Sequence, residues 1–310
     1  MNRSSWCALA LALAFVSAGT AHAADPLNAV LERFAPVFVQ VAHGKADYVT
    51  RFDYDGDWNG ANNWDHLDAG HPLPAVIYAS AIESARHYFL TYSAFHPRDY
   101  WPVSVPDVNH ENDLEGVLLV VEKREGQLVP LLMESVAHQH LLRYSSDPAL
   151  AHEHLNGKLF FEGEHPLVHV AAYKHPQSAM GSAELWKVDG IVYRFHARSD
   201  VPKGLHDRDC GYALISLLDS FWPRRFDVGH DRTFGSTDTF APGTFGAGLN
   251  GHKYAANRAH APWAWRDSDD EGLAHGDWFF DPAHAMRFHY PGIKERFVSD
   301  YRVNPYLEGR

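Results

Sequence analysis

The segment 109–116, with the sequence NHENDLEG, contains the residues best suited to chemistry in this chain. Asp113 and Glu115 are two residues apart where an apolar strand is expected to begin, so both carboxylates should point to the same face of that strand. Two neighbouring carboxylates repel each other, and in a partly buried place one of them normally takes up a proton. A divalent cation between them removes the repulsion, so the spacing predicts a cation site.

Two other residues can complete this site. His110 ends the loop before the strand and can offer an imidazole nitrogen, and Asp99 ends the strand that is expected to pair nearby. Three carboxylates and one imidazole leave room for water, and they suit Mg²⁺, Ca²⁺ or Mn²⁺ better than a structural zinc ion held by sulfur. The alternative is that all four are ordinary hydrogen-bonded polar residues at strand ends.

These and later motifs resemble those of the necrosis-inducing (Nep1-like, NPP1) secreted proteins and of the related Vps62-type domains. The matching motifs, all within residues 34–180, are YSAFHPRD at 92–99, His110-x-x-Asp113-x-Glu115, Ser135-x-x-His138 and Lys174-His175. The resemblance implies a β-sandwich with flanking helices and a divalent ion held by Asp99, His110, Asp113 and Glu115. It also implies that His138, with His140 as the competing assignment, lies near the ion and reaches it through water. The chain departs from the family pattern by lacking its disulfide cysteines and at Asn109, Glu111, Asn112 and Leu114.

A second acidic cluster, Asp53, Asp55 and Asp57, lies in a loop that ends at Gly60. Alternating carboxylates on a tight loop are typical of a calcium site, although the glycine position and the closing glutamate of an EF-hand are missing. The sequence therefore favours a solvated loop rich in Asx turns, with a structural calcium ion as the alternative. Trp58 and Trp64 beside this loop are expected to pack in the core or at its rim, the alternative being a sugar-stacking or membrane-interface surface.

No nucleophile or cofactor motif is present: the chain has no Gly-x-Ser-x-Gly, no His-Glu-x-x-His and no phosphate-binding loop. If an ion activates water, Glu115 and His138 are the candidates for moving the proton. Cys210 matches no nucleophile motif, and we expect a structural thiol.

Composition narrows the classes of partner and the compartment. The 310 residues include 27 Lys+Arg and 39 Asp+Glu, for a net charge of −12 without a basic stripe, so nucleic-acid binding is not expected. Residues 1–23 have a positive start, an apolar run and the Ala21-His22-Ala23 motif, which predict a signal peptide and a secreted or periplasmic protein. No later run approaches 18 apolar residues, so no transmembrane segment is expected, although peripheral membrane contact is compatible with the sequence.

The elements that must position the candidate site are mainly β-strands. Alternating and apolar runs predict strands at 75–82, 87–95, 114–122, 128–135, 166–172, 184–187 and 191–196, with hairpin turns at 125–127 and 188–190. Residues 26–38 are expected to form a short helix or a helix-to-strand passage that ends at Pro36, and a helix is expected at 212–222. The pattern predicts a mainly β fold with peripheral helices and a β-sandwich core. We expect one domain over residues 24–310 with a long, loop-rich C-terminal extension.

Three functions are compatible with such a site. The first is a secreted, divalent-metal-dependent protein that binds a glycan, glycolipid or lipid head group through the ion and acts at membranes. The second is a metal-dependent hydrolase that uses an ion-activated water. The third is a structural secreted domain that an ion stabilises. The sequence does not decide whether the protein is an enzyme.

Overall fold

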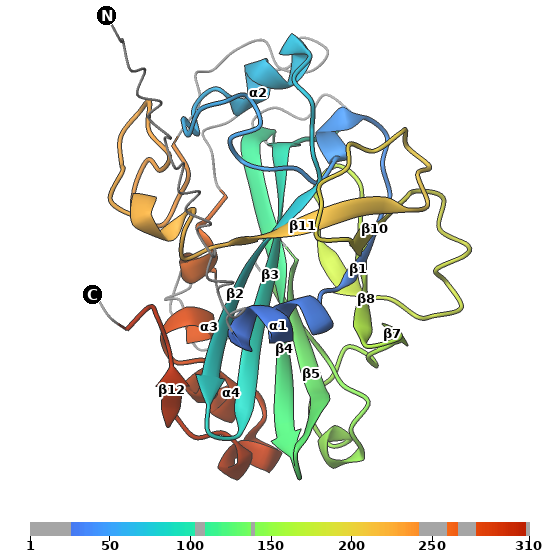
Figure 1. Cartoon of the computed structure of the whole chain (residues 1–310), viewed down its shortest axis with the longest axis vertical. Helices are drawn as coiled ribbons and strands as arrows, with labels where there is room; N and C mark the ends of the chain where they lie inside the picture. Colours follow the sequence, from blue (N-terminus) through green and yellow to red (C-terminus); the bar gives the residue numbers. More distant parts are fainter. Residues whose placement is uncertain (1–25, 103–108, 138–139, 242–258, 266–276, 308–310) are drawn as a thin grey trace, which may run out of the picture.

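The computed structural model describes residues 26–102, 109–137, 140–241, 259–265 and 277–307 (Figure 1). Strands dominate this part of the chain. In chain order they are β1 (Val37–Gln40), β2 (Val76–Ser84), β3 (His87–Asp99), β4 (His110–Arg124), β5 (Gln127–Ala137), β6 (His140–Tyr144), β7 (Phe161–Glu162), β8 (His165–Val170), β9 (Gln177–Ala179), β10 (Ile191–Phe195), β11 (Cys210–Ser216) and β12 (Tyr301–Val303).

The helices are short and lie around the strands (Figure 1). The α-helices are α1 (Pro26–Arg33), α2 (Asn63–His66), α3 (Asp277–Phe280) and α4 (Pro282–His289). The 3₁₀ turns are η1 (Lys45–Asp47), η2 (Leu67–Ala69), η3 (Pro148–Leu150), η4 (Trp222–Arg224), η6 (Pro262–Ala264) and η7 (Pro291–Arg296). No helix within the described ranges is long and apolar enough to cross a membrane.

The strands form one mixed sheet in the order β6-β5-β4-β3-β2-β11-β10-β1-β8-β7, with β12 paired to β2 and β9 paired to β8. This sheet folds back on itself, because β9 from its far end packs against β5. Ser135 Oγ on β5 donates to Gln177 O on β9 at 2.7 Å, and Gln177 Nε2 donates to Glu115 O on β4 at 3.0 Å. The prediction of a mainly β fold with peripheral helices and a β-sandwich core is confirmed.

The two longest strands, β3 and β4, are buried on both faces along most of their length, as expected for the centre of a sheet. β4 continues into β5 through a two-residue turn at Glu125 and Gly126, whose φ angles of 48° and 82° are both left-handed. That geometry matches the right-handed twist of the paired strands. The hairpin predicted at 125–127 is therefore confirmed.

Two of the predicted elements are wrong. Residues 212–222 do not form a helix, because Cys210–Ser216 lies as strand β11 between β2 and β10, parallel to both. Pairing with two neighbours outweighs the local preference of an apolar run that suits either element. The run 184–187 is a turn and not a strand, so no hairpin forms at 188–190. Ile191 pairs instead with Gln40 on β1, and Gly190 is placed where a Cβ atom would collide with Gln40 O.

The described C-terminal residues pack on the body of the sheet. β12 extends the edge of β2, and Tyr306 Oη lies 2.6 Å from Ser80 Oγ on that strand. In Figure 1, α3, α4 and β12 lie together beside the ends of the long strands β2 to β5. These contacts bury the aromatic residues Trp278, Phe279 and Tyr306.

Candidate metal centre

The antiparallel register of β3 and β4 brings the predicted ligands to one end of a single ladder. Asp99 is paired with His110, His96 with Asp113, and Ala94 with Glu115. Asp99, Asp113 and Glu115 are each no more than 5% exposed. The end of this ladder is therefore a buried polar region of the sheet.

Asn112 interrupts the extended backbone of β4 between His110 and Asp113. Its φ of 59° is left-handed, a conformation that asparagine tolerates better than most residues. The side chain fixes this geometry, because Asn112 Nδ2 donates to Gly60 O at 2.6 Å and Asn112 Oδ1 accepts from Asn63 Nδ2 at 2.7 Å. The loop before α2 and the first residue of α2 thus hold the start of β4.

Asp99 and His110 contact each other across the ladder, with 3.3 Å between Asp99 Oδ2 and His110 Nε2. His110 Nδ1 lies 3.1 Å from the backbone oxygens of both Glu111 and Asn112. Because both oxygens only accept, the proton of a neutral His110 ring is on Nδ1 and the lone pair of Nε2 faces Asp99. Burial lowers the pKa of His110, but the nearby carboxylates of Asp99 and Asp113 outweigh burial and raise it.

Asp99 has a second positive neighbour, since Lys174 Nζ donates to Asp99 Oδ1. Burial by itself raises the pKa of Asp99, but His110 and Lys174 together hold that pKa down at about 2. The carboxylate is therefore ionised at neutral pH. It lies between two groups that supply positive charge.

Asp113 contacts His175, which lies in the loop between β8 and β9. His175 Nδ1 is 2.8 Å from Asp113 Oδ2, and His175 Nε2 is 3.2 Å from Asp47 Oδ1 at the end of η1. Burial lowers the pKa of His175, but the two carboxylates raise it to about 9. His175 is therefore an imidazolium that donates to both carboxylates in the metal-free protein.

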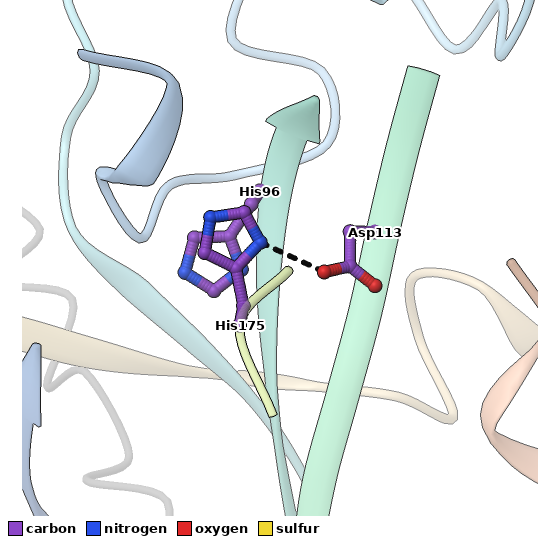
Figure 2. Close-up of side chains that lie close together, drawn as sticks. All are labelled: His96, Asp113 and His175. Atoms are coloured by element: carbon purple, nitrogen blue, oxygen red, sulfur yellow. Dashed lines mark hydrogen bonds and ion pairs between the residues drawn. The ribbon is translucent and has the colours of Figure 1, made fainter. Parts of the chain in front are cut away.

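His96 stacks on His175 (Figure 2). The two rings are nearly parallel, with an interplanar angle of 5° and 3.7 Å between centroids, and Asp113 lies beside the pair. His96 Nε2 is 3.0 Å from Gln40 Oε1 on β1. Burial, together with the positive charge of His175, lowers the pKa of His96 well below its ordinary range, so this ring is neutral.

Two groups in the described part of the chain place three potential ligand atoms within 4.8 Å of one another. They are His96 with Asp113 and His175, and Asp55 with Asp57 and His66. Of the four predicted ligands Asp99, His110, Asp113 and Glu115, only Asp113 belongs to such a group. The four-residue ion site stays a prediction.

Three residues of the site were not among the ligands predicted from the sequence. His96 belongs to the motif at 92–99, and its pairing with Asp113 follows once the β3/β4 register is known. His175 was indicated only by the family resemblance. Asp47 has no local signal, because only the tertiary fold brings η1 to the loop that carries His175.

The other predicted ligands have different outcomes. His138 lies outside the described residues, and His140 is exposed at the start of β6. Glu115 is buried, and its backbone oxygen accepts from Gln177. Burial raises the pKa of the Cys210 thiol to about 12, which makes the thiol unreactive at neutral pH and agrees with a structural role.

The second acidic cluster differs in membership from the predicted one. Asp53 pairs with Arg51 at 2.6 Å, whereas Asp55 contacts His66 Nδ1 on α2 at 2.5 Å. Asp57 accepts from Asn59 N at 2.8 Å, in an Asx turn of the kind expected here. The packing expected of the neighbouring tryptophans is confirmed, since Trp64 is 2% exposed and Trp58 packs against the core.

A cavity of about 470 Å³ is lined in part by Arg98 and Tyr100, the residues before and after Asp99 in the sequence. Its lining combines aromatic, basic and acidic side chains, among them His43, Lys45, Arg98, Tyr100 and Tyr173. His43 stacks on Tyr173 with 4.8 Å between ring centroids. A cavity of this size and mixed lining can hold a small polar ligand.

Comparisons with known proteins give a distant likeness. No protein-family model and no curated protein matches the chain. The solved structures that it resembles include NLPPya in complex with mannosamine, at 15% identity and a TM-score of 0.35 over 62% of this chain and 73% of that one. Another is described as "Toxin fold as basis for microbial attack and plant defense", at 13% identity and a TM-score of 0.36 over 66% and 80%.

A third is Necrosis and Ethylene inducing Protein 2 from the causal agent of cocoa's Witches Broom disease, at 15% identity and a TM-score of 0.34 over 65% and 78% of the two chains. Solved necrosis-inducing proteins are thus among the structures that this chain distantly resembles. Membership of that superfamily, like the likeness to Vps62-type domains, stays a prediction.

Proposed function

We propose that this chain is a secreted protein that binds a glycan or glycolipid head group through a divalent cation held by Asp99, His110, Asp113 and Glu115. The contact between Asp99 and His110 carries the proposal. Asp99 Oδ2 and His110 Nε2 lie 3.3 Å apart in a largely buried place, as two ligands of one ion would. A divalent cation could take the place of the proton on His110 Nε2 and bind both members of the pair.

The fixed His110 ring supports a ligand role. Histidines that bind metals usually donate their other ring nitrogen to a backbone oxygen or a carboxylate, which fixes the ring and its tautomer. His110 Nδ1 makes such contacts with two backbone oxygens. An ion bound at Nε2 would supply the charge that Lys174 gives Asp99 in the metal-free protein, and its open positions would accept hydroxyl oxygens.

The neighbouring cavity supports a hydroxyl-rich ligand. Tyr173 and His43 place stacked aromatic rings there, and the exposed Trp101 contacts Tyr173 edge-on at 5.9 Å between centroids. Sugar rings bind such surfaces through their C–H faces while their hydroxyls reach polar groups. The exposed Lys45 adds a positive group that suits an anionic head group.

The test combines metal analysis, melting and ligand binding of the purified mature protein. We expect a bound divalent ion, a lower melting temperature with chelator, and chelator-sensitive binding on an array of neutral and anionic glycans. Asp99→Asn should remove all three effects. The control Asp53→Asn, which alters an arginine-paired carboxylate in the other acidic loop, should keep them. Wild-type protein that carries no ion and melts alike with and without chelator would refute the ion site.

The same preparation tests the alternative of hydrolysis, and exported protein tests the proposed secretion. Cation-dependent turnover of ester, glycoside or phosphate substrates would show that the protein is a metal-dependent hydrolase and not a binding protein. Secretion is supported by the signal-peptide pattern in residues 1–23. Sequencing the N-terminus of exported protein should find Ala24, and retention of the full chain in the cytoplasm would contradict this part of the proposal.

A further inference from the structure

We propose that His96, Asp113 and His175 form a second cation site, which selects a transition ion such as Zn²⁺ over Mg²⁺ and Ca²⁺. Each residue places one potential ligand atom within 4.8 Å of the other two, and all three side chains are buried. The site uses two nitrogens and one oxygen, whereas the ion proposed above has mainly oxygen ligands. The two sites share Asp113, whereas His96 and His175 belong to this site alone.

His96 carries a lone pair with no partner in the described part of the chain. Gln40 Nε2 donates to the backbone oxygens of Val41 and Ala171, at 3.1 and 3.2 Å, which fixes the orientation of the Gln40 amide. Gln40 Oε1 must therefore accept from His96 Nε2. The proton of this neutral ring is on Nε2, and the buried Nδ1 is left without a hydrogen bond. A buried polar atom without a hydrogen bond needs an explanation, and an absent ion is one.

Both histidines are held at the nitrogen that would lie away from the ion. Gln40 holds His96 Nε2, and Asp47 Oδ1 lies 3.2 Å from His175 Nε2. Partners of this kind are found on most metal-binding histidines, where they fix the ring and increase its basicity. The two Nδ1 atoms are then left for an ion, together with Asp113 Oδ2 at 2.8 Å from His175 Nδ1.

A proton occupies part of this site in the metal-free protein, between His175 Nδ1 and Asp113. When an ion binds, that proton leaves to solvent and the freed lone pair of His175 binds the ion. The ion then faces the carboxylate of Asp113, with the carboxylate of Asp47 behind His175. The two rings lie face to face in Figure 2, so they must rotate until both lone pairs converge on the ion.

The donor set determines the kind of ion. Imidazole nitrogens suit Zn²⁺, Ni²⁺, Cu²⁺ and Fe²⁺, whereas Mg²⁺ and Ca²⁺ prefer sites made of oxygen. Two histidines and one carboxylate also leave at least one coordination position open. We therefore expect a site for zinc or a similar ion that shares Asp113 with the proposed magnesium or calcium ligands.

The test is titration of chelator-treated, tag-free mature protein with Zn²⁺ and, separately, Mg²⁺ and Ca²⁺. Loss of a residue that only hydrogen-bonds a metal ligand lowers metal affinity by about 10–100-fold. We expect His96→Phe to weaken Zn²⁺ binding by more than this, because it removes a ligand. Binding of Mg²⁺ or Ca²⁺ should stay within a few-fold of the wild type. His87→Phe is the matched control, because His87 is also a fully buried histidine on β3 but lies outside the cluster. It should bind Zn²⁺ like the wild type.

Unchanged Zn²⁺ affinity in His96→Phe would overturn the proposal. The proposal would also be overturned if Asp99→Asn lost Zn²⁺ binding while His96→Phe kept it. The nitrogen ligand would then belong to the other ion site. If His96→Phe does not fold, X-ray absorption of wild-type protein loaded with one equivalent of Zn²⁺ decides the question. Two imidazoles per zinc support the site, and one or none refutes it.

Discussion

His175 and Asp47 form a fully buried ion pair, with 3.2 Å between His175 Nε2 and Asp47 Oδ1. Asp47 also accepts from Tyr173 N at 2.8 Å and from Tyr100 Oη at 3.0 Å. A single carboxylate therefore ties η1 to the loop that carries Lys174 and His175. We expect this carboxylate to help fix the position of that loop, together with the backbone hydrogen bond that Tyr100 N donates to Tyr173 O.

We therefore predict that Asp47→Ala lowers the free energy of unfolding by about 3–5 kcal/mol, since it leaves a buried imidazolium with one partner removed. Asp47→Asn keeps one acceptor and should lose less. Urea denaturation gives both values. The exposed Asp209 provides the control, and Asp209→Asn should change stability by less than about 0.5 kcal/mol. An Asp47→Ala protein as stable as the wild type would show that the pair does not fix the loop.

Gly116 lies directly after Glu115, at a point where β3 and a tryptophan approach the strand closely. A Cβ atom there would lie 2.7 Å from both Tyr92 O and Trp265 Cη2. The backbone oxygen cannot move without breaking the ladder, so Gly116→Ala should cost about 1–3 kcal/mol by overpacking. Thermal or urea unfolding measures the loss. Gly204→Ala, at a site with open space and no positive φ, should be neutral, and equal effects of the two changes would contradict the explanation.

The central sheet could be predicted from the sequence because its strands have strong local signals. The strand predicted at 114–122 is apolar on both faces, and the turn at Glu125 and Gly126 has the left-handed angles that such turns require. β11 could not be predicted, because its apolar run has no alternation and only its two parallel neighbours make it a strand. Long-range pairing of this kind cannot be predicted from the pattern of a short stretch of sequence.

The candidate site was predictable only in part, for a similar reason. Asp99, His110, Asp113 and Glu115 lie at the ends of two strands that pair as expected, so the sequence brings them to one region. His175 and Asp47 reach Asp113 through folding of the sheet onto itself, over separations that no spacing rule covers. The stacked ring of His96 needed the exact register of β3 and β4.

Glu134 anchors the C-terminal helices to β5. Its two carboxylate oxygens accept from Trp278 Nε1 at 3.0 Å and contact His289 Nδ1 at 2.7 Å, and Glu134 and His289 are both essentially buried. Glu134→Ala leaves both of these groups buried without their partner, which should cost about 3 kcal/mol or more. Relative to the wild type, the variant should show a larger increase in the rate of amide hydrogen exchange in α4 than in β3. Uniform acceleration over the whole chain would instead indicate global unfolding and contradict a local anchor.

We predict that burial of His87 makes the protein sensitive to acid. Burial lowers its pKa from 6.5 to about 4, against a smaller opposite effect of Glu122, and Arg296 and Arg86 lower the pKa further. Between these two pH values the unfolded chain binds more protons than the folded one. The free energy of unfolding therefore falls as the pH drops from about 6.5 to about 4. Below about pH 4, His87 causes no further change. The total loss is on the order of 3 kcal/mol.

His87→Phe should therefore reduce the difference in stability between pH 7 and pH 4. Phenylalanine has a similar shape and no ring nitrogens, and the described structure gives neither nitrogen of His87 a hydrogen bond, so the variant should also be at least as stable as the wild type at pH 7. Urea denaturation at a series of pH values measures both effects. His284→Phe, which alters a more exposed histidine on α4, should leave the pH profile unchanged. If His87→Phe keeps the full acid sensitivity of the wild type, other groups must cause it.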